Sequence, residues 1–253
     1  MGNLPDSLVE FSERFDPATW VILRLDGRGF TNRARAYARP FDPRFHEAMR
    51  NATEALLAET PAAFAHTASD EISLFFAPGT DWFDGRMAKW LSISAGLASA
   101  ALARSMTAFV GLPTMDAKAF SAPDENGLAD YLFERAKSSR RNCRNGYVHY
   151  TLLAQGLGAR AAERAAQKMS GAQMAQFVPP EAPAWELFGA YAHYALVERQ
   201  GADPRSGRLM PPTLRRVLRW TEVANLDELS DLVTRLLVSR PTRRTRPESG
   251  ESR

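Results

Sequence analysis

Two short acidic segments hold the residues of this sequence that are best suited to chemistry. The first, Leu25–Phe30 with the sequence LDGRGF, follows the apolar stretch Trp20–Leu23. The second, Ser69–Glu71, runs directly into the apolar stretch Ile72–Phe76. Each segment places a carboxylate at the end of a short strand-like run, where a turn can direct it at a shared site. Because carboxylates brought together from distant positions suit divalent metal ions and triphosphates, the pair predicts an enzyme.

The elements around these segments follow from apolar spacing and from helix caps. Trp20–Leu25 is short and apolar, so we expect a buried strand there. Asp42 before Pro43 predicts the start of a helix, because aspartate is a good N-cap and proline suits the first helical position. Residues 62–67 and 71–76 then predict two strands of a hairpin, with the second acidic segment at its tip.

A second helix and a fourth strand complete the first part of the chain. Residues 81–109 predict one long helix, on which Arg86, Lys89 and Ser92 share a face because they are three residues apart. Residues 114–120 predict a further strand. The resulting order is β, α, β, β, α, β, the split βαβ pattern of ferredoxin-like folds. We therefore predict an α+β fold with a palm-like domain of the kind found in polymerases and nucleotidyl cyclases.

The rest of the chain predicts a mainly helical extension. Its expected helices cover residues 128–142, 147–155, 159–169 and 226–237. We expect a palm-like catalytic domain at 1–125, a helical C-terminal part at 126–239 that completes the nucleotide and acceptor site, and a disordered basic tail at 240–253. That tail has five arginines and two glutamates, so it accounts for the whole formal net charge of +3. A second basic run at 135–144 is better placed to meet phosphates.

Neither acidic segment is decisive alone, because Asp-Gly-Arg is an ordinary turn and polar residues are common at hairpin tips. In a βαββαβ unit, however, the end of the first strand and the tip of the central hairpin are neighbours. Phosphoryl transfer needs the triphosphate charge neutralised and the attacking oxygen in line, and two Mg²⁺ ions between carboxylates do both. Gly27 and Gly29 let backbone approach phosphate closely. We expect Arg86, Lys89 and Ser92 to contact the β and γ phosphates.

Other classes of protein find little support in these 253 residues. We find no run of about 18 apolar residues, which a membrane span would need, and no signal segment at the N-terminus. Cys143 is the only cysteine, which excludes an internal disulfide and a multi-cysteine metal site. The four histidines, His46, His66, His149 and His193, lack ligand spacing, and no P-loop appears. We therefore expect a cytoplasmic protein with no membrane partner.

With these motifs in this order, the sequence resembles the tRNA-His guanylyltransferase family, in particular its bacterial guanylyltransferase-like branch of 3′-5′ RNA polymerases. The segments that carry the resemblance are 20–30, 39–43, 69–74, 89–92 and 130–142. The resemblance implies addition of a guanosine, or of a templated nucleotide, to the 5′ end of tRNA or a related RNA. GTP, and ATP for activating a 5′ phosphate, are the implied substrates. A homotetramer is the implied assembly.

The resemblance also implies roles for individual residues. Asp26, the Gly27 carbonyl and Asp70 are the implied metal ligands, with Glu71 as an essential acidic neighbour. Asp26, Asp70 and Glu71 are thus the implied catalytic residues. The implied nucleotide contacts are Asp26, Gly27, Arg28, Gly29, Phe30, Thr31, Ser69, Asp70, Lys89 and Ser92.

The second half of the chain departs from the family pattern, which leaves three hypotheses open. The family's Arg-Gln-x-Asp motif reads Arg135–Ser138 here, its Phe-Asp-Gly-Arg strand reads Met115–Lys118, and a basic pair is replaced by Leu187–Phe188. The first hypothesis is a Mg²⁺-dependent nucleotidyltransferase acting on an RNA 5′ end. The second is a repurposed palm-fold nucleotidyltransferase or cyclase with a non-tRNA acceptor. The third is a catalytically silent nucleotide-binding protein, which retention of all three acidic residues disfavours.

Overall fold

A six-stranded antiparallel sheet forms the centre of the molecule, with the strand order β4-β1-β3-β2-β5-β6. The structure, a computed structural model, describes residues 13–201, 209–210 and 213–238. The predicted tail at 240–253 lies outside these residues. The strands are β1 (Trp20–Gly27), β2 (Phe64–Ala68), β3 (Glu71–Phe76), β4 (Met115–Ala122), β5 (Ala190–Arg199) and β6 (Thr213–Glu222). Every neighbouring pair in the sheet is antiparallel.

The predicted β, α, β, β, α, β order is observed, and an α+β fold with an antiparallel sheet is confirmed. Strand β3 lies between β1 and β2, as in a split βαβ unit. The helices of this first part are α1 (Phe30–Arg33), α2 (Pro43–Glu59), the 3₁₀ helix η1 (Phe83–Gly85) and α3 (Met87–Ser105). The later helices are α4 (Glu125–Ala154), α5 (Ala159–Gln167), α6 (Gly171–Ala175), α7 (Ala184–Phe188) and α8 (Leu226–Val238).

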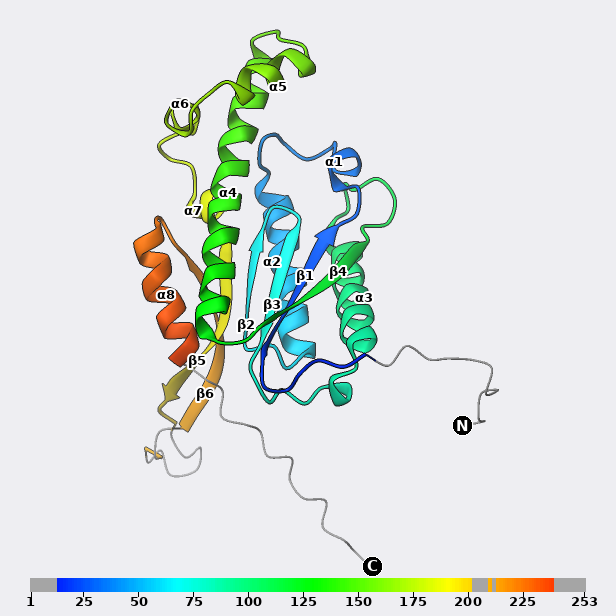
Figure 1. Ribbon diagram of the computed structural model, residues 1–253, viewed down its shortest axis with the longest axis vertical. Coiled ribbons are helices and arrows are strands. Elements are labelled where there is room, and N and C mark those ends of the chain that lie inside the picture. Colours follow the sequence, from blue (N-terminus) through cyan, green and yellow to red (C-terminus); the bar gives the residue numbers. More distant parts are fainter. Residues whose placement is uncertain (1–12, 202–208, 211–212, 239–253) are drawn as a thin grey trace, which may run out of the picture.

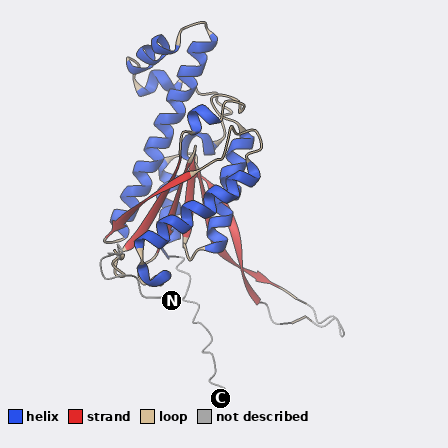
Figure 2. Cartoon of the chain, turned by 90° about the vertical axis from the view of Figure 1, so that its right-hand side faces the viewer, coloured by secondary structure: helices blue, strands red, loops and turns tan. Residues whose placement is uncertain are grey.

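Helices cover both faces of the sheet, as Figures 1 and 2 show. Strand β1 is buried on both sides because its side chains alternate between two cores. Val21 and Leu23 belong to the core under α2 and α3, whereas Trp20 and Ile22 belong to the core under α4 and α8. The face that carries Trp20 and Ile22 therefore also carries Asp26, at the open end of the strand.

Local capping signals are confirmed at α2. The Asp42 side chain accepts a hydrogen bond from the backbone N–H of Arg44, and Pro43 is the first helical residue. The predicted helix at 81–109, in contrast, begins only at Met87 and ends at Ser105. Phe83 and Asp84 have φ angles of 49° and 51°, a left-handed conformation that cannot belong to an α-helix.

The C-terminal part differs from its prediction in two ways. The expected helices at 128–142 and 147–155 form one helix, α4, because Gly146 continues the helix and lets it lie against Pro40 and Phe41. Two long strands, β5 and β6, were not predicted at all. They extend the sheet beyond β2 and form a hairpin that reaches past the helices in Figure 2. The helices predicted at 159–169 and 226–237 are present as α5 and α8.

Candidate active site

The two acidic segments meet at one end of the sheet. The backbone N–H of Gly27 donates a hydrogen bond to the carbonyl of Asp70 over 3.0 Å. Asp26 lies directly opposite Glu71 in the register of β1 and β3. Two loops that are 44 residues apart in the sequence are thus joined, and their carboxylates share one edge of the sheet.

Backbone conformation and close packing shape both loops. Ser69 and Gly29 have φ angles of 54° and 70°, which turn the chain sharply beside each carboxylate. A Cβ atom at Gly27 would lie 2.5 Å from the nearest atom of the Phe30 ring, so only glycine fits there. The Ser69 hydroxyl donates to Asp70 Oδ1 over 3.3 Å. These contacts hold the loops in one arrangement before any ligand binds.

The charges of this edge are partly compensated. Burial raises the pKa of Asp70 above its ordinary value, and the nearby Asp26 carboxylate raises it further. Burial also raises the pKa of Glu71, which Arg135 and Arg24 oppose. Arg135 Nη1 lies 3.2 Å and Arg24 Nε 3.6 Å from Glu71 Oε2. Glu71 is therefore neutralised by the protein itself, whereas Asp26 and Asp70 form a pair of like charges.

Such a pair fits a divalent cation. A buried carboxylate whose ionised form is disfavoured by a like charge gains most when a cation lies between the two. Within the described residues, no group of three or more His, Cys, Asp or Glu side chains is arranged to hold a metal ion. The predicted set is two carboxylates and the Gly27 carbonyl, so water or phosphate oxygens have to complete the coordination shell.

Asp116 is a further carboxylate at this edge, and sequence reasoning gave it no role. It lies directly opposite Asp26 in the register of β1 and β4, on the side of Asp26 away from Glu71. Residues opposite each other in an antiparallel pair point to the same face of the sheet. Three acidic residues on three adjacent strands therefore form a row.

The arginines that neutralise Glu71 were also missed as site residues. Arg24 lies two residues before Asp26, so strand periodicity assigns it to the same face. Arg135 comes from α4, and the sequence shows it only as part of a basic run and as the first residue of the altered Arg-Gln-x-Asp motif. The hydroxyl of Tyr131, also on α4, forms a hydrogen bond with the hydroxyl of Ser73 over 2.9 Å. Helix α4 is thus connected to the acidic hairpin by polar contacts.

A small pocket of about 110 Å³ opens beside Asp70. Four residues expected to contact a nucleotide, Phe30, Thr31, Ser69 and Asp70, line it. Its wall contains several aromatic rings. The other lining residues are Ala34, Tyr37, Ala38, Arg39, Pro40, Phe41, Asp42, Phe45, His46 and Trp185. Aromatic rings next to paired carboxylates suit a flat ring, such as a nucleobase, whose phosphates lie at the carboxylates.

Two predicted nucleotide contacts lie elsewhere. Lys89 and Ser92 are exposed on α3 on either side of Trp90, whose ring packs on Phe76 with centroids 4.7 Å apart. Phe76 pairs with Val21, five residues before Asp26, which is about 16 Å along a strand. Lys89 and Ser92 therefore lie far from Asp26 along the sheet, and their contact with a nucleotide stays a prediction. The helix begins near the opposite end of β1, which helical periodicity alone could not reveal.

The remaining predicted contacts lie beside the acidic pair. Arg28 and Gly29, on the loop after β1, and Thr31, in the short helix α1, are exposed. Phe30 is only 2% exposed, and its ring packs against Phe109 with centroids 4.7 Å apart. Phe30 is therefore mainly a core residue that supports the loop, although it also lines the small pocket.

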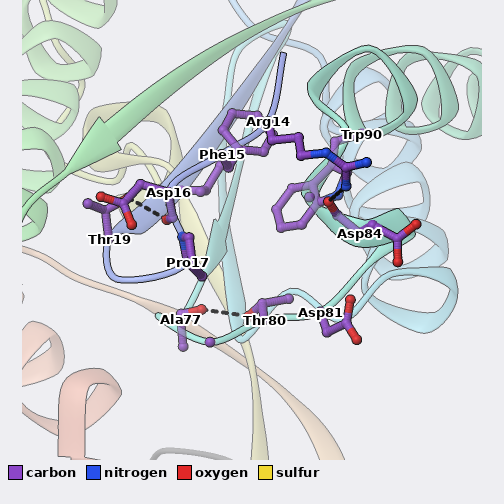
Figure 3. A pocket seen from close by; sticks show the side chains of 13 residues that line it. Arg14, Phe15, Asp16, Pro17, Thr19, Ala77, Thr80, Asp81, Asp84 and Trp90 are labelled. Carbon is purple, nitrogen blue, oxygen red and sulfur yellow. Dashed lines mark hydrogen bonds between the residues drawn. The ribbon is translucent and has the colours of Figure 1, made fainter. Parts of the chain in front are cut away.

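A larger cavity of about 450 Å³ lies at the other end of β1, where Thr19 and Ala77 line it (Figure 3). The rings of Phe15 and Trp90 pack at a tilt in its wall, with centroids 4.9 Å apart. Short local hydrogen bonds, such as that from the Thr80 hydroxyl to the Ala77 carbonyl over 2.6 Å, hold its rim. The residues of the acidic edge do not line this cavity.

Residues 7–123 match the model of the tRNAHis guanylyltransferase family. This range contains Asp26, Asp70 and Glu71, which meet at one edge of the sheet. This region of the chain belongs to the family. Its relatives include the tRNA(His) guanylyltransferase of Neurospora crassa, 32% identical over 163 residues that cover 60% of this chain and 53% of that protein. The tRNA(His) guanylyltransferase of Schizosaccharomyces pombe is 26% identical, over 57% of this chain and 58% of that protein. The chain thus spans about half the length of the curated relatives that it matches.

Solved structures of the family share the fold. The tRNA(His) guanylyltransferase of Saccharomyces cerevisiae superposes with a TM-score of 0.66 at 18% identity, covering 72% of this chain and 88% of that one. A bacterial guanylyltransferase-like protein in complex with ATP has the same TM-score at 21% identity, covering 89% and 93%. This second likeness extends past residue 123, so the fold of the guanylyltransferase-like proteins includes the C-terminal part.

Proposed function

We propose that this family member is a Mg²⁺-dependent nucleotidyltransferase that adds a nucleotide from GTP to the 5′ end of tRNA or a related RNA, in the 3′-5′ direction. The observation that carries the proposal is the meeting of Asp26 and Asp70 on two hydrogen-bonded loops. The matching family consists of nucleotidyltransferases, and a guanylyltransferase-like structural neighbour is in complex with GTP.

The acidic residues of the site have different roles in this proposal. Asp26, the Gly27 carbonyl and Asp70 would hold Mg²⁺, two ions in our proposal, which neutralises triphosphate charge and orients the attacking oxygen. Glu71, paired with Arg24 and Arg135, keeps the hairpin tip in place. The palm-like unit at 1–125 would carry this chemistry, and 126–239 would complete the site.

The proposal also assigns the nucleotide contacts, the assembly and the location of the protein. The exposed residues Arg28, Gly29 and Thr31, with Ser69, would contact the nucleotide, and the small pocket would take its base. ATP would serve where a 5′ monophosphate has to be activated. We further propose a homotetramer that works in the cytoplasm. No helix among the described residues has the length and apolar character to cross a membrane.

Incorporation of labelled GTP into tRNA that lacks its 5′ nucleotide tests the proposal. We expect incorporation that depends on Mg²⁺ and disappears in Asp70→Asn, while Arg104→Ala keeps it, because Arg104 is exposed in the last turn of α3 and does not line the small pocket. Tight nucleotide binding without incorporation into any tRNA would contradict an RNA acceptor.

One observation favours a second candidate function, an enzyme of the same chemistry with a non-tRNA acceptor. Phe188 stands where the family carries a basic residue, and its side chain is only 3% exposed. A core residue at this position cannot bind substrate phosphate. Incubation with each nucleoside triphosphate and Mg²⁺, followed by mass analysis, separates the candidates, because cyclisation or dinucleotide formation needs no RNA. Absence of any product together with intact binding would favour a silent nucleotide-binding protein.

A further inference from the structure

The wall of the small pocket contains one residue from far along the chain. Trp185, on α7, lines the pocket together with Ser69 and Asp70 although more than 110 residues separate them. It lies outside the range 7–123 that matches the family model. The C-terminal part of the chain therefore contributes directly to the pocket beside the acidic pair.

The Trp185 ring is held in a stack. It lies parallel to the His46 imidazole, with centroids 4.0 Å apart and an angle of 9° between the planes. The Phe41 ring lies edge-on to the Trp185 ring, with centroids 6.2 Å apart and an angle of 89° between the planes. Burial lowers the pKa of His46 to about 4, so the imidazole is neutral at pH 7 and stacks without a charge. His46 Nε2 is buried and has no hydrogen-bond partner within the described residues, so stacking is the contact that we can assign to this ring.

The backbone that carries Trp185 is anchored next to it. The Tyr147 hydroxyl of α4 donates a hydrogen bond to Glu186 Oε2 over 2.5 Å. Phe188 is buried in the core, with the Arg140 guanidinium 5.7 Å from its ring centroid. A short helix fixed at these points presents its tryptophan in one place, which reduces the entropy cost of binding a ligand.

Apart from Asp70, the charged groups of the pocket are already engaged within the protein. Asp42 accepts hydrogen bonds from the backbone N–H of Ala38 over 2.8 Å and from Arg44 Nη2 over 2.7 Å. Arg39 donates to the carbonyl of Thr31 over 3.1 Å. The aromatic rings of the wall can hold a flat ligand by stacking.

We propose that Trp185, backed by His46, is the stacking surface for the nucleobase of the nucleotide whose phosphates lie at Asp26 and Asp70. The proposal rests on the proposed function, and it assigns a base-positioning role to a residue outside the matched range. Stacking of a base on an aromatic side chain changes affinity by about 5- to 100-fold. The contact is tolerant of sequence, since every base has a π-face.

Binding of three ligands in the presence of Mg²⁺ tests the proposal: GTP, ATP and inorganic tripolyphosphate. In Trp185→Ala we expect the dissociation constants of GTP and ATP to rise by about 5- to 100-fold, while tripolyphosphate binding stays unchanged. Trp185→Phe should retain most of the affinity. Trp185→Leu keeps apolar volume but has no π-face, so it should lose as much affinity for GTP and ATP as Trp185→Ala. It also tests the proposal if the alanine variant does not fold.

Trp220→Ala is the matched control. Trp220 is a half-buried tryptophan on β6 whose Nε1 donates to Glu54, and it does not line the pocket. We expect its nucleotide binding to equal that of the wild type. Equal weakening of GTP and tripolyphosphate in Trp185→Leu, or unchanged GTP binding, would overturn the stacking role. A base-specific loss in a protein that adds no nucleotide to RNA would support the stacking role while contradicting the proposed function.

Discussion

The backbone N–H of Gly27 donates a hydrogen bond to the carbonyl of Asp70 over 3.0 Å. This bond joins the loop after β1 to the tip of the β2–β3 hairpin. Since each loop carries one carboxylate of the candidate metal site, a shift of either loop changes the distance between the two carboxylates. The site therefore depends on backbone packing as much as on the acidic side chains.

Gly27→Ala should damage both stability and nucleotide binding. The added Cβ would lie 2.5 Å from the Phe30 ring, which is 2% exposed and cannot move without disturbing the core. We expect a loss of about 1–3 kcal/mol in the free energy of unfolding, as for other overpacked cores. Urea denaturation followed by circular dichroism measures it. Gly96→Ala is the control: nothing lies within 4 Å of its Cβ in the middle of α3, so it should leave stability equal or higher.

Glu71→Gln and Asp70→Asn should affect the metal-free protein in opposite directions. Glu71→Gln leaves the half-buried Arg24 and Arg135 without their carboxylate, so we expect a loss of about 1–3 kcal/mol. Asp70→Asn removes a carboxylate whose ionised form is disfavoured by burial and by Asp26, so thermal stability should be equal or higher. Both variants should lose nucleotide addition. A lower melting temperature for Asp70→Asn would show that its carboxylate supports the fold.

The pKa of Asp70 predicts how metal binding depends on pH. It lies above the ordinary value of 3.8, so Mg²⁺ has to displace a proton over a range above that value, and affinity should fall as pH is lowered through it. In the metal-free protein, the stability that Asp70 contributes is fully present below its unfolded pKa and is lost as pH rises through the raised folded pKa. NMR titration of the Asp70 carboxyl group checks both statements. Asp26→Asn should lower this pKa, and an unchanged value would show that burial acts alone.

Asp42→Ala should destabilise the start of α2. The carboxylate is buried, 5% exposed, and accepts from the backbone N–H groups of Ala38 and Arg44. We expect a loss of about 1 kcal/mol or more, as for other N-caps. Because Arg44 holds the pKa of Asp42 well below 3.8, this stability is present above pH 3.8 and is lost as the pH falls below it.

Arg44→Ala provides the comparison for the cap. The Arg44 side chain is 68% exposed, and the variant keeps the backbone N–H that Asp42 accepts from. Arg44→Ala should therefore lower the free energy of unfolding clearly less than Asp42→Ala does when both are measured by urea denaturation. Equal losses would mean that the ion pair, and not the N-cap, holds the helix start.

The sequence alone predicted the part of the fold whose elements carry their own local pattern. Trp20–Leu25 reads as a strand by its apolar run, Asp42 with Pro43 marks a helix start, and the acidic segments fall where strands end. The order of these elements was enough to bring Asp26 near Asp70, because a split βαβ unit places those ends together. The family resemblance rests on the same region, which the family model matches at 7–123.

Tertiary structure decided what depends on partners distant in sequence. Strands β5 and β6 pair with each other, and β5 also pairs with β2, although the sequence pattern predicted no strand in either segment. Arg135 neutralises Glu71, and Trp185 enters the pocket, only because α4 and α7 pack over the sheet. Lys89 shares a helix face with Ser92, yet the direction of α3 places both residues near the end of β1 that is opposite to Asp26. Local spacing specifies which residues share a face; packing between elements decides what that face meets.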